Sequence, residues 1–194
     1  KLFPESLAAR GIAPGIKVDG GTEPFPESPG ELITQGLIGL PERLAAYKKQ
    51  GTVFTKWRAV ITIDGDTLPS AKAIHENARR LASDAKEVQA AGMVPLLEPE
   101  VLLDGKHSRE RAKAVIIETV STLFSVLEEH AVDSSGVILK TAMALTGNFR
   151  FEVDKVVRVS VHPLVPIKFR RSLGLRYPLD GLRLAPGERT GTSN

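Results

Sequence analysis

The sequence predicts an α/β fold of the (β/α)8 barrel class, with about four central βα units present. Predicted strands and helices alternate from residue 12 to residue 140, and the strands are almost continuously apolar, as is typical of parallel strands covered by helices. Charged residues recur beside successive strands at intervals of 39, 42 and 42 residues: Lys17, Lys56, Glu98 and Lys140. Because each strand of a barrel contributes side chains to one rim, this spacing favours a barrel over a doubly wound sheet.

The first two units begin with short strands. Residues 12–18 are predicted to form a strand after a turn, and a Gly/Pro-rich loop with repeated turn signals follows at 19–30. A helix is expected to begin at Pro41 and to end before Gly51, because proline suits the first turn of a helix and glycine tolerates the positive φ that ends one. The β-branched stretch 57–63 is the second predicted strand.

Two longer helices and two more strands follow. Ser70 is the expected N-cap of a helix that Gly92 ends, and Ser108 is the expected N-cap of the next helix. Apolar residues recur at spacings of three and four, which predicts one buried stripe on each helix: Ile74, Ala78, Leu81, Ala85 and Val88 on the first, and Ile116, Val120, Leu123 and Leu127 on the second. The predicted strands are residues 93–101 and 136–140.

Composition and charge exclude several classes of protein. The 194 residues include no cysteine, which argues against a disulfide scaffold and against thiolate chemistry. No apolar run is long enough to cross a bilayer, so we expect no membrane partner and a cytoplasmic location. Residues 1–148 carry 17 Lys and Arg against 19 Asp and Glu, a net charge of −2, whereas residues 149–194 carry 9 against 4, a net charge of +5. Because the basic charge belongs to the end of the chain alone, we expect no nucleic-acid partner.

Motifs for metals and cofactors are missing from the sequence. The histidines, His75, His107, His130 and His162, show no spacing typical of metal ligands, so no metal site is predicted. Neither a G-x-S-x-G motif nor a P-loop nor a dinucleotide-binding fingerprint is present. Serine hydrolysis, ATP hydrolysis and hydride transfer therefore lose support, and no cofactor is expected.

A lysine at the end of an apolar strand is the strongest candidate for chemistry. An isolated lysine in such a place, here Lys140, is commonly a solvated side chain. Beside apolar neighbours and facing another lysine, however, its ammonium form would be disfavoured. A neutral lysine is a nucleophile that forms a Schiff base with a ketone, and the iminium then accepts electrons from an adjacent carbon–carbon bond.

Two carboxylates and three cations complete the candidate site. Glu98 and Glu100 share a strand face, where Glu98 would move protons and Glu100 would neutralise and position the lysines; alternatively, both are solvated loop residues. Lys56 and Arg58 also share a face, and Lys17 adds a cation from the preceding strand. Together these cations imply an anionic substrate, such as one that carries phosphates.

Four short motifs carry a family resemblance. GIKVDGG (15–21), KWRAV (56–60), VPLLEPEV (94–101) and GVILKTAM (136–143) resemble, in this order, class I fructose-bisphosphate aldolase, the metal-independent Schiff-base type. The resemblance implies a TIM barrel, a phosphorylated sugar substrate, no cofactor, and a homo-oligomer, which in the family is usually a homotetramer. The implied reaction is the reversible cleavage of fructose 1,6-bisphosphate to dihydroxyacetone phosphate and glyceraldehyde 3-phosphate, in glycolysis and gluconeogenesis.

The resemblance also implies catalytic roles. Lys140 matches the Schiff-base lysine, and Glu98 matches the acid that transfers protons around carbinolamine formation. Lys56 matches the lysine that assists cleavage and binds substrate. Glu100 matches the carboxylate that pairs with the active-site lysines.

The resemblance also implies substrate-binding roles, and the sequence departs from the family pattern in several places. Lys17 and Arg58 match cations that line the substrate path. Residues 18–21 read VDGG where VDKG is common, and the family's first-strand aspartate and late phosphate-binding arginine lie outside the 194 residues. We therefore expect a partial barrel at 1–148 and a divergent basic tail at 149–194. The tail is either a shifted reading frame or misjoined segment, or a divergent β-rich extension.

Two other interpretations stay open at this point. The chain could belong to another Schiff-base lyase that acts on a different phosphorylated ketose or keto acid. It could also be a catalytically inactive, truncated aldolase-like protein that serves as a scaffold, because the expected phosphate-binding half is missing.

Overall fold

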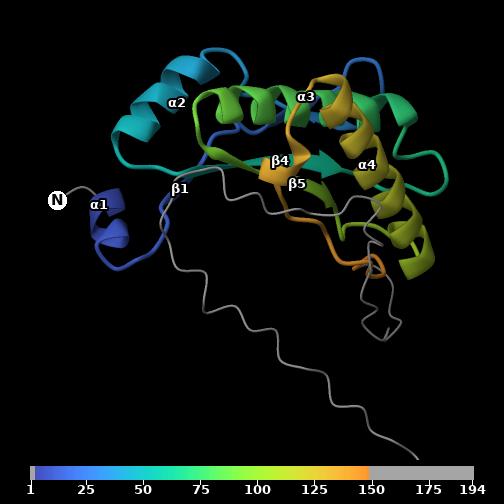
Figure 1. The fold of residues 1–194 in the computed structure, drawn as a ribbon. Coiled ribbons are helices and arrows are strands. Elements are labelled where there is room, and N and C mark those ends of the chain that lie inside the picture. Colours follow the sequence, from blue (N-terminus) through green and yellow to red (C-terminus); the bar gives the residue numbers. More distant parts are fainter. Residues whose placement is uncertain (1–2, 149–194) are drawn as a thin grey trace, which may run out of the picture.

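Four strands form one parallel sheet, in the order β1, β4, β5 and β6, in the computed structural model, which describes residues 3–148 (Figure 1). The predicted tail domain at 149–194 lies outside the described residues. The strands are β1 Gly15–Lys17, β4 Phe54–Ile61, β5 Val94–Val101 and β6 Ile138–Leu139. Each neighbouring pair is parallel, which confirms the predicted succession of βα units.

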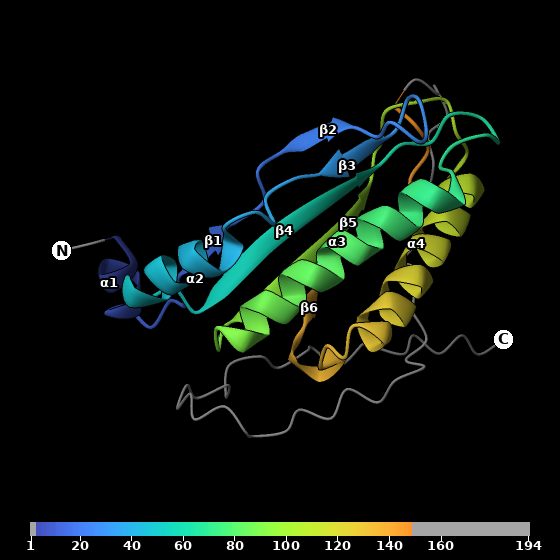
Figure 2. The same cartoon turned by 90° about the horizontal axis from the view of Figure 1, so that it is seen from above.

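Three helices lie on one face of this sheet. They are α2 Leu40–Lys49, α3 Ala71–Ala90 and α4 Arg109–Glu129, and a short helix, α1 Phe3–Ala8, precedes β1. Figure 2 shows α3 and α4 side by side over the strands, and α3 contacts both β4 and β5. The opposite face of the same strands carries the charged residues that the sequence singled out.

Serine side chains cap the two long helices as predicted. The Ser70 hydroxyl accepts a hydrogen bond from the Ala73 N–H, and the Ser108 hydroxyl accepts one from the Arg111 N–H, both at 3.1 Å. Each bond satisfies an amide of the first turn that has no partner within the helix. Beyond the end of α3, Gly92 has a φ of +69°, the left-handed conformation that glycine adopts at low cost.

The core lies between these helices and the sheet. The predicted stripes on α3 and α4 are buried, with relative exposures between 0% and 6%. Trp57, fully buried on the helix-facing side of β4, packs in the same cluster as Leu81 and Leu97. Burying a side chain of this size contributes about 1.5–3 kcal/mol, so the helix-facing side of the sheet supplies most of the hydrophobic stabilisation.

The structure differs from the sequence prediction in the loop after β1 and at several strand ends. The predicted loop at 19–30 and the residues after it contain an antiparallel hairpin, β2 Thr22–Pro24 with β3 Leu32–Thr34. Strand β4 begins at Phe54, three residues before the predicted 57, and β6 contains only two residues of the predicted 136–140. Strand ends and three-residue strands depend on pairing with distant segments, which local patterns do not encode.

A buried carboxylate lies in α3 where the helix meets the core. Asp84 has a relative exposure of 0%, and neither of its carboxylate oxygens has a hydrogen-bond partner among the described residues. The pKa of Asp84 is raised to about 8, mainly by burial and also by the charge of Asp19, while the charge of Arg43 acts to lower it. The folded protein therefore holds a proton on Asp84 at neutral pH.

Replacing Asp84 tests this assignment. The folded pKa is raised above the ordinary value of 3.8, so the unfolded chain releases this proton first and stability falls as the pH rises from about 4 to about 8. Asp84→Asn is neutral at every pH, and its free energy of unfolding should fall less between pH 5 and pH 8 than that of the wild type. Urea unfolding at the two pH values measures this difference. The exposed Asp66→Asn is the control, and equal losses in Asp84→Asn and wild type would contradict the assignment.

Candidate active site

The strand register places the candidate residues at adjacent levels of the sheet. Lys17 of β1 lies in register with Lys56 of β4, and Arg58 of β4 lies in register with Glu98 of β5. The backbone N–H of Lys140 donates to the carbonyl of Leu97 at 2.9 Å, which extends the β5–β6 ladder to the level of Glu98. Residues in register share a face, so these side chains converge on the side of the sheet opposite the helices.

Glu98 is the centre of the site. It has a relative exposure of 7% and lies inside β5, so it is a strand residue and not a solvated loop carboxylate. Its Oε1 accepts a hydrogen bond from Nζ of Lys140, and its Oε2 forms an ion pair with Nζ of Lys56. One carboxylate therefore bridges Lys56 of β4 and Lys140, which directly follows β6.

The charge state of Glu98 follows from these contacts. Burial acts to raise its pKa, but the hydrogen bonds and charges of Lys140 and Lys56 outweigh burial, so the pKa of Glu98 lies below its ordinary value of 4.5. Glu98 is a carboxylate at neutral pH. The ion pairs contribute stability above about pH 4.5 that is lost as the pH falls through the lowered pKa.

Glu100 has a different partner from the predicted one. We expected Glu100 to neutralise and position the lysines, but its Oε2 accepts a hydrogen bond from Nε of Arg58. The register explains the difference. Glu100 pairs with Val60, two residues beyond the Arg58–Glu98 pair and on the same face of the sheet, opposite the helices. Each basic side chain of β4 therefore contacts the carboxylate two residues beyond its register partner on β5: Lys56 contacts Glu98, and Arg58 contacts Glu100.

Lys140 is more exposed than its expected role suggested. The prediction placed it among apolar neighbours that would disfavour its charge, yet its side chain is 61% exposed and pairs with Glu98. Within residues 3–148, β6 has only β5 as a neighbour, so no further strand of this part of the chain covers the lysine. The expected desolvation is therefore absent from the described part of the chain.

Lys17 belongs to a contact that the sequence reasoning missed. Its Nζ lies 2.5 Å from Oδ1 of Asp19, a side chain that is only 3% exposed although Lys17 is 55% exposed. The sequence offered one indication of this contact: Asp19, in VDGG, directly follows the end of the predicted strand. Nothing local showed that its carboxylate would turn inward.

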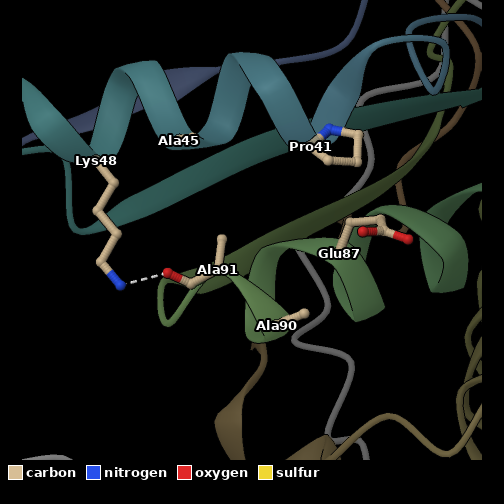
Figure 3. A pocket seen from close by; sticks show the side chains of 6 residues that line it. All are labelled: Pro41, Ala45, Lys48, Glu87, Ala90 and Ala91. Carbon is tan, nitrogen blue, oxygen red and sulfur yellow. Dashed lines mark hydrogen bonds between the residues drawn. The ribbon is translucent and has the colours of Figure 1, made fainter.

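A pocket of about 230 Å³ opens beside this cluster. Its lining includes Glu98, Glu100 and Lys140 with the apolar Val101, Leu103, Ala142, Met143 and Leu145. A larger pocket of about 330 Å³ lies between α2 and α3, where Lys48 donates a hydrogen bond to the carbonyl of Ala91 (Figure 3). Of the two pockets, only the smaller one contains Lys140 and Glu98, so it is the pocket of the candidate site.

The described residues contain neither a cluster of potential metal ligands nor a helix that could span a membrane. Within residues 3–148, no group of three or more His, Cys, Asp or Glu side chains could hold a metal ion. None of the helices in this part of the chain has the length and apolar character needed to cross a membrane.

Comparison with known sequences points to one family. A family model described as fructose-bisphosphate aldolase class-I matches residues 1–165. The match extends past residue 148, so the predicted division of the chain at that residue stays a prediction. A probable class 1 fructose-bisphosphate aldolase of Xylella fastidiosa is 48% identical over 145 residues, which are 75% of this chain and 43% of the relative. Fructose-bisphosphate aldolase C-B of Danio rerio is 44% identical over 146 residues, 75% of this chain and 40% of the relative.

A solved structure supports the same relationship. The fructose-bisphosphate aldolase of Plasmodium falciparum, determined with TRAP and a small-molecule inhibitor, superposes with a TM-score of 0.75 at 39% identity. The alignment covers 78% of this chain and 44% of that chain. The chain thus spans less than half the length of these relatives. This likeness confirms the predicted partial TIM barrel, and together with the family match it confirms the resemblance: the chain belongs to the class-I fructose-bisphosphate aldolase family.

Proposed function

We propose that the protein represented by this chain cleaves fructose 1,6-bisphosphate reversibly to dihydroxyacetone phosphate and glyceraldehyde 3-phosphate, through a Schiff base on Lys140. The observation that carries the proposal is the buried carboxylate of Glu98, which contacts both Lys140 and Lys56. An amine next to a group that can accept and return its proton is the arrangement that imine formation needs.

Imine formation uses Lys140 and Glu98. Glu98 accepts a proton from the Lys140 ammonium, and the neutral amine attacks the ketone carbon. One proton then passes from the nitrogen to the oxygen, which gives a carbinolamine. Glu98 then returns the proton to the carbinolamine oxygen, which leaves as water, and an iminium remains on Lys140. The positive iminium withdraws electrons from the adjacent carbon–carbon bond while Glu98, now a carboxylate again, takes the proton of the hydroxyl group on the leaving carbon. The bond breaks, an aldehyde is released and an enamine remains on Lys140.

Binding of the anionic substrate falls to the cations of β1 and β4. Lys56 shares Glu98 with Lys140, so it lies next to the reacting carbon and assists cleavage there. Arg58 and Lys17 lie on the strands farther from Lys140, and both are more than 40% exposed, so their charges can meet a phosphate or the sugar hydroxyls. Arginine and lysine are the residues that proteins commonly use for phosphate.

The substrate class, the oligomeric state and the cellular location proposed for the protein follow from its family. We propose a phosphorylated sugar as the substrate and a homo-oligomer, with a tetramer as the expected form, acting in the cytoplasm. Analytical ultracentrifugation of the purified protein measures the oligomeric state.

An inactive chain is the second candidate. The 61% exposure of the Lys140 side chain favours it, because the proposed nucleophile is open to water and not enclosed with a substrate. In that case the chain binds phosphorylated sugars at most and does not form the iminium.

Reductive trapping tests the central step. With dihydroxyacetone phosphate and borohydride, the wild type should acquire one reduced adduct, and peptide mass mapping should place it on Lys140. Lys140→Met should lose the adduct, whereas Lys72→Met, at a lysine that is 71% exposed on α3, should keep it. A folded wild type without an adduct would favour the inactive chain.

Replacing Glu98 tests the proton transfer. Glu98→Gln keeps the size of the side chain and removes its ability to accept a proton, so the trapping rate on Lys140 should fall by about 10²-fold. The matched control is Glu118→Gln, at an exposed position of α4, which should trap at the wild-type rate. Glu98 would not be the proton carrier if its variant kept the wild-type rate.

A further inference from the structure

The carboxylate of Asp19 replaces part of a strand at the edge of the candidate site. Strand β1 ends at Lys17, and its last ladder contact is the N–H of Val18, which donates to the carbonyl of Lys56 at 3.0 Å. One step further along β4, the N–H of Arg58 donates to Oδ2 of Asp19 at 3.2 Å. A side-chain oxygen therefore takes the place of the next backbone carbonyl of β1.

The carbonyl of Arg58 is also held by a side chain. The hydroxyl of Thr34, at the end of β3, donates to it at 2.9 Å, and Thr34 is 1% exposed. Both backbone groups of Arg58 that face β1 are thus satisfied by side chains. The guanidinium of the same residue reaches Glu100, so Arg58 is held at three points.

The turn that carries Asp19 is held in place by the hairpin beside it. The N–H of Gly20 donates to the carbonyl of Gln35 at 2.7 Å, and the N–H of Gln35 donates to the carbonyl of Gly21 at 2.8 Å. Gly36 has a φ of +124°, and a Cβ atom there would lie 2.7 Å from the nitrogen of Gly20. This close approach of two backbones fixes the direction in which Asp19 points.

Asp19 also holds the ammonium group of Lys17, the cation of β1. Its Oδ1 lies 2.5 Å from Nζ of Lys17 and accepts a hydrogen bond from the N–H of Gly21 at 3.3 Å. A buried carboxylate is costly unless it is paired and hydrogen-bonded, and Asp19 meets both conditions at once. Its contacts therefore tie the exposed ammonium of Lys17 to the backbone of Arg58.

We propose that Asp19 and Thr34 are positioning residues that fix where Lys17 and Arg58 present their charges to an anionic substrate. The inference rests on the proposed function for its substrate class, a sugar that carries two phosphates. Neither residue needs to touch the substrate, because each acts through Lys17, Arg58 or both. Loss of Asp19 should weaken binding of the anion, and loss of Thr34 should do so to a smaller extent.

The substitution Asp19→Asn separates positioning from simple structural support. Asparagine has one acceptor oxygen, so it can keep the hydrogen bond from Arg58 but not also the one that Gly21 makes to the other carboxylate oxygen, and it carries no charge for Lys17. The binding probe is hexane-1,6-diol bisphosphate, which has two phosphate esters and no ketone, so it cannot form a Schiff base. We expect calorimetry to show a dissociation constant about tenfold higher than that of the wild type, a change equivalent to about 1.4 kcal/mol.

Two controls distinguish the explanations. Asp133→Asn alters a carboxylate that accepts the N–H of Ser135 at 3.0 Å before β6, at the opposite end of the strands, and should leave binding unchanged. Unfolding followed by the fluorescence of Trp57, the one tryptophan of the chain, measures stability in each variant. A purely structural role would lower the free energy of unfolding of Asp19→Asn and leave its dissociation constant at the wild-type value, and that result would overturn the inference.

A second variant covers the case in which Asp19→Asn does not fold. Thr34→Val keeps the shape of the side chain and removes the bond to Arg58, so it should raise the dissociation constant, whereas Thr34→Ser should restore it. Equal binding by Thr34→Val and the wild type would then overturn the inference.

The proposed function has its own readout. The trapping experiment at Lys140 involves no step that depends on Asp19 alone, so an absent adduct with weaker binding by Asp19→Asn would remove the catalytic proposal and support the positioning role. A wild type that does not bind the bisphosphate would overturn the positioning role, and the adduct on Lys140 would then decide the catalytic proposal by itself.

Discussion

The pairing of β4 with β5 is the constraint on which the rest of the structure depends. The two strands run in unbroken register from Phe54 opposite Val94 to Ile61 opposite Val101. Side chains alternate along each strand, so one set packs under α3 and α4 and the other forms the charged face. A slip of one residue in this register would exchange the two sets, burying lysine under the helices and exposing Trp57. The apolar core therefore enforces the geometry of the candidate site.

Electrostatics on the charged face follow a simple rule in the described residues. Each buried or half-buried carboxylate there has a basic partner: Glu98 has Lys56 and Lys140, Glu100 has Arg58, and Asp19 has Lys17. Pairing offsets the desolvation of the carboxylates, and the basic side chains remain between 24% and 61% exposed to an incoming anion. Asp84, which lacks such a partner, instead holds a proton with a pKa raised to about 8. The same physical cost thus produces ion pairs on one face and a neutral acid on the other.

Local sequence patterns predicted the parts of the fold whose causes are local. The serine caps, the stripes of α3 and α4, and the shared face of Lys56 and Arg58 each depend on residues within a few positions of one another. The hairpin β2–β3 was missed because strands of three residues carry little periodicity, and the partner of Glu100 was wrong because it depends on strand register. Asp19 and Thr34 were missed for the same reason, since both contact Arg58 across distant segments.

The sequence by itself determined the order of βα units, the buried stripes of α3 and α4 and the set of charged residues at the strand ends, because hydrophobic periodicity and residue type act over short distances. Its four motifs also carried the family, since their order along the chain is specific. Only the tertiary structure decided which acidic side chain pairs with which basic one. Lys140 and Glu98, for example, are 42 positions apart in the sequence and come into contact only through the β5–β6 pairing. The same holds for Asp19, whose carboxylate completes the ladder beside Arg58 only once β1, β3 and β4 are packed together.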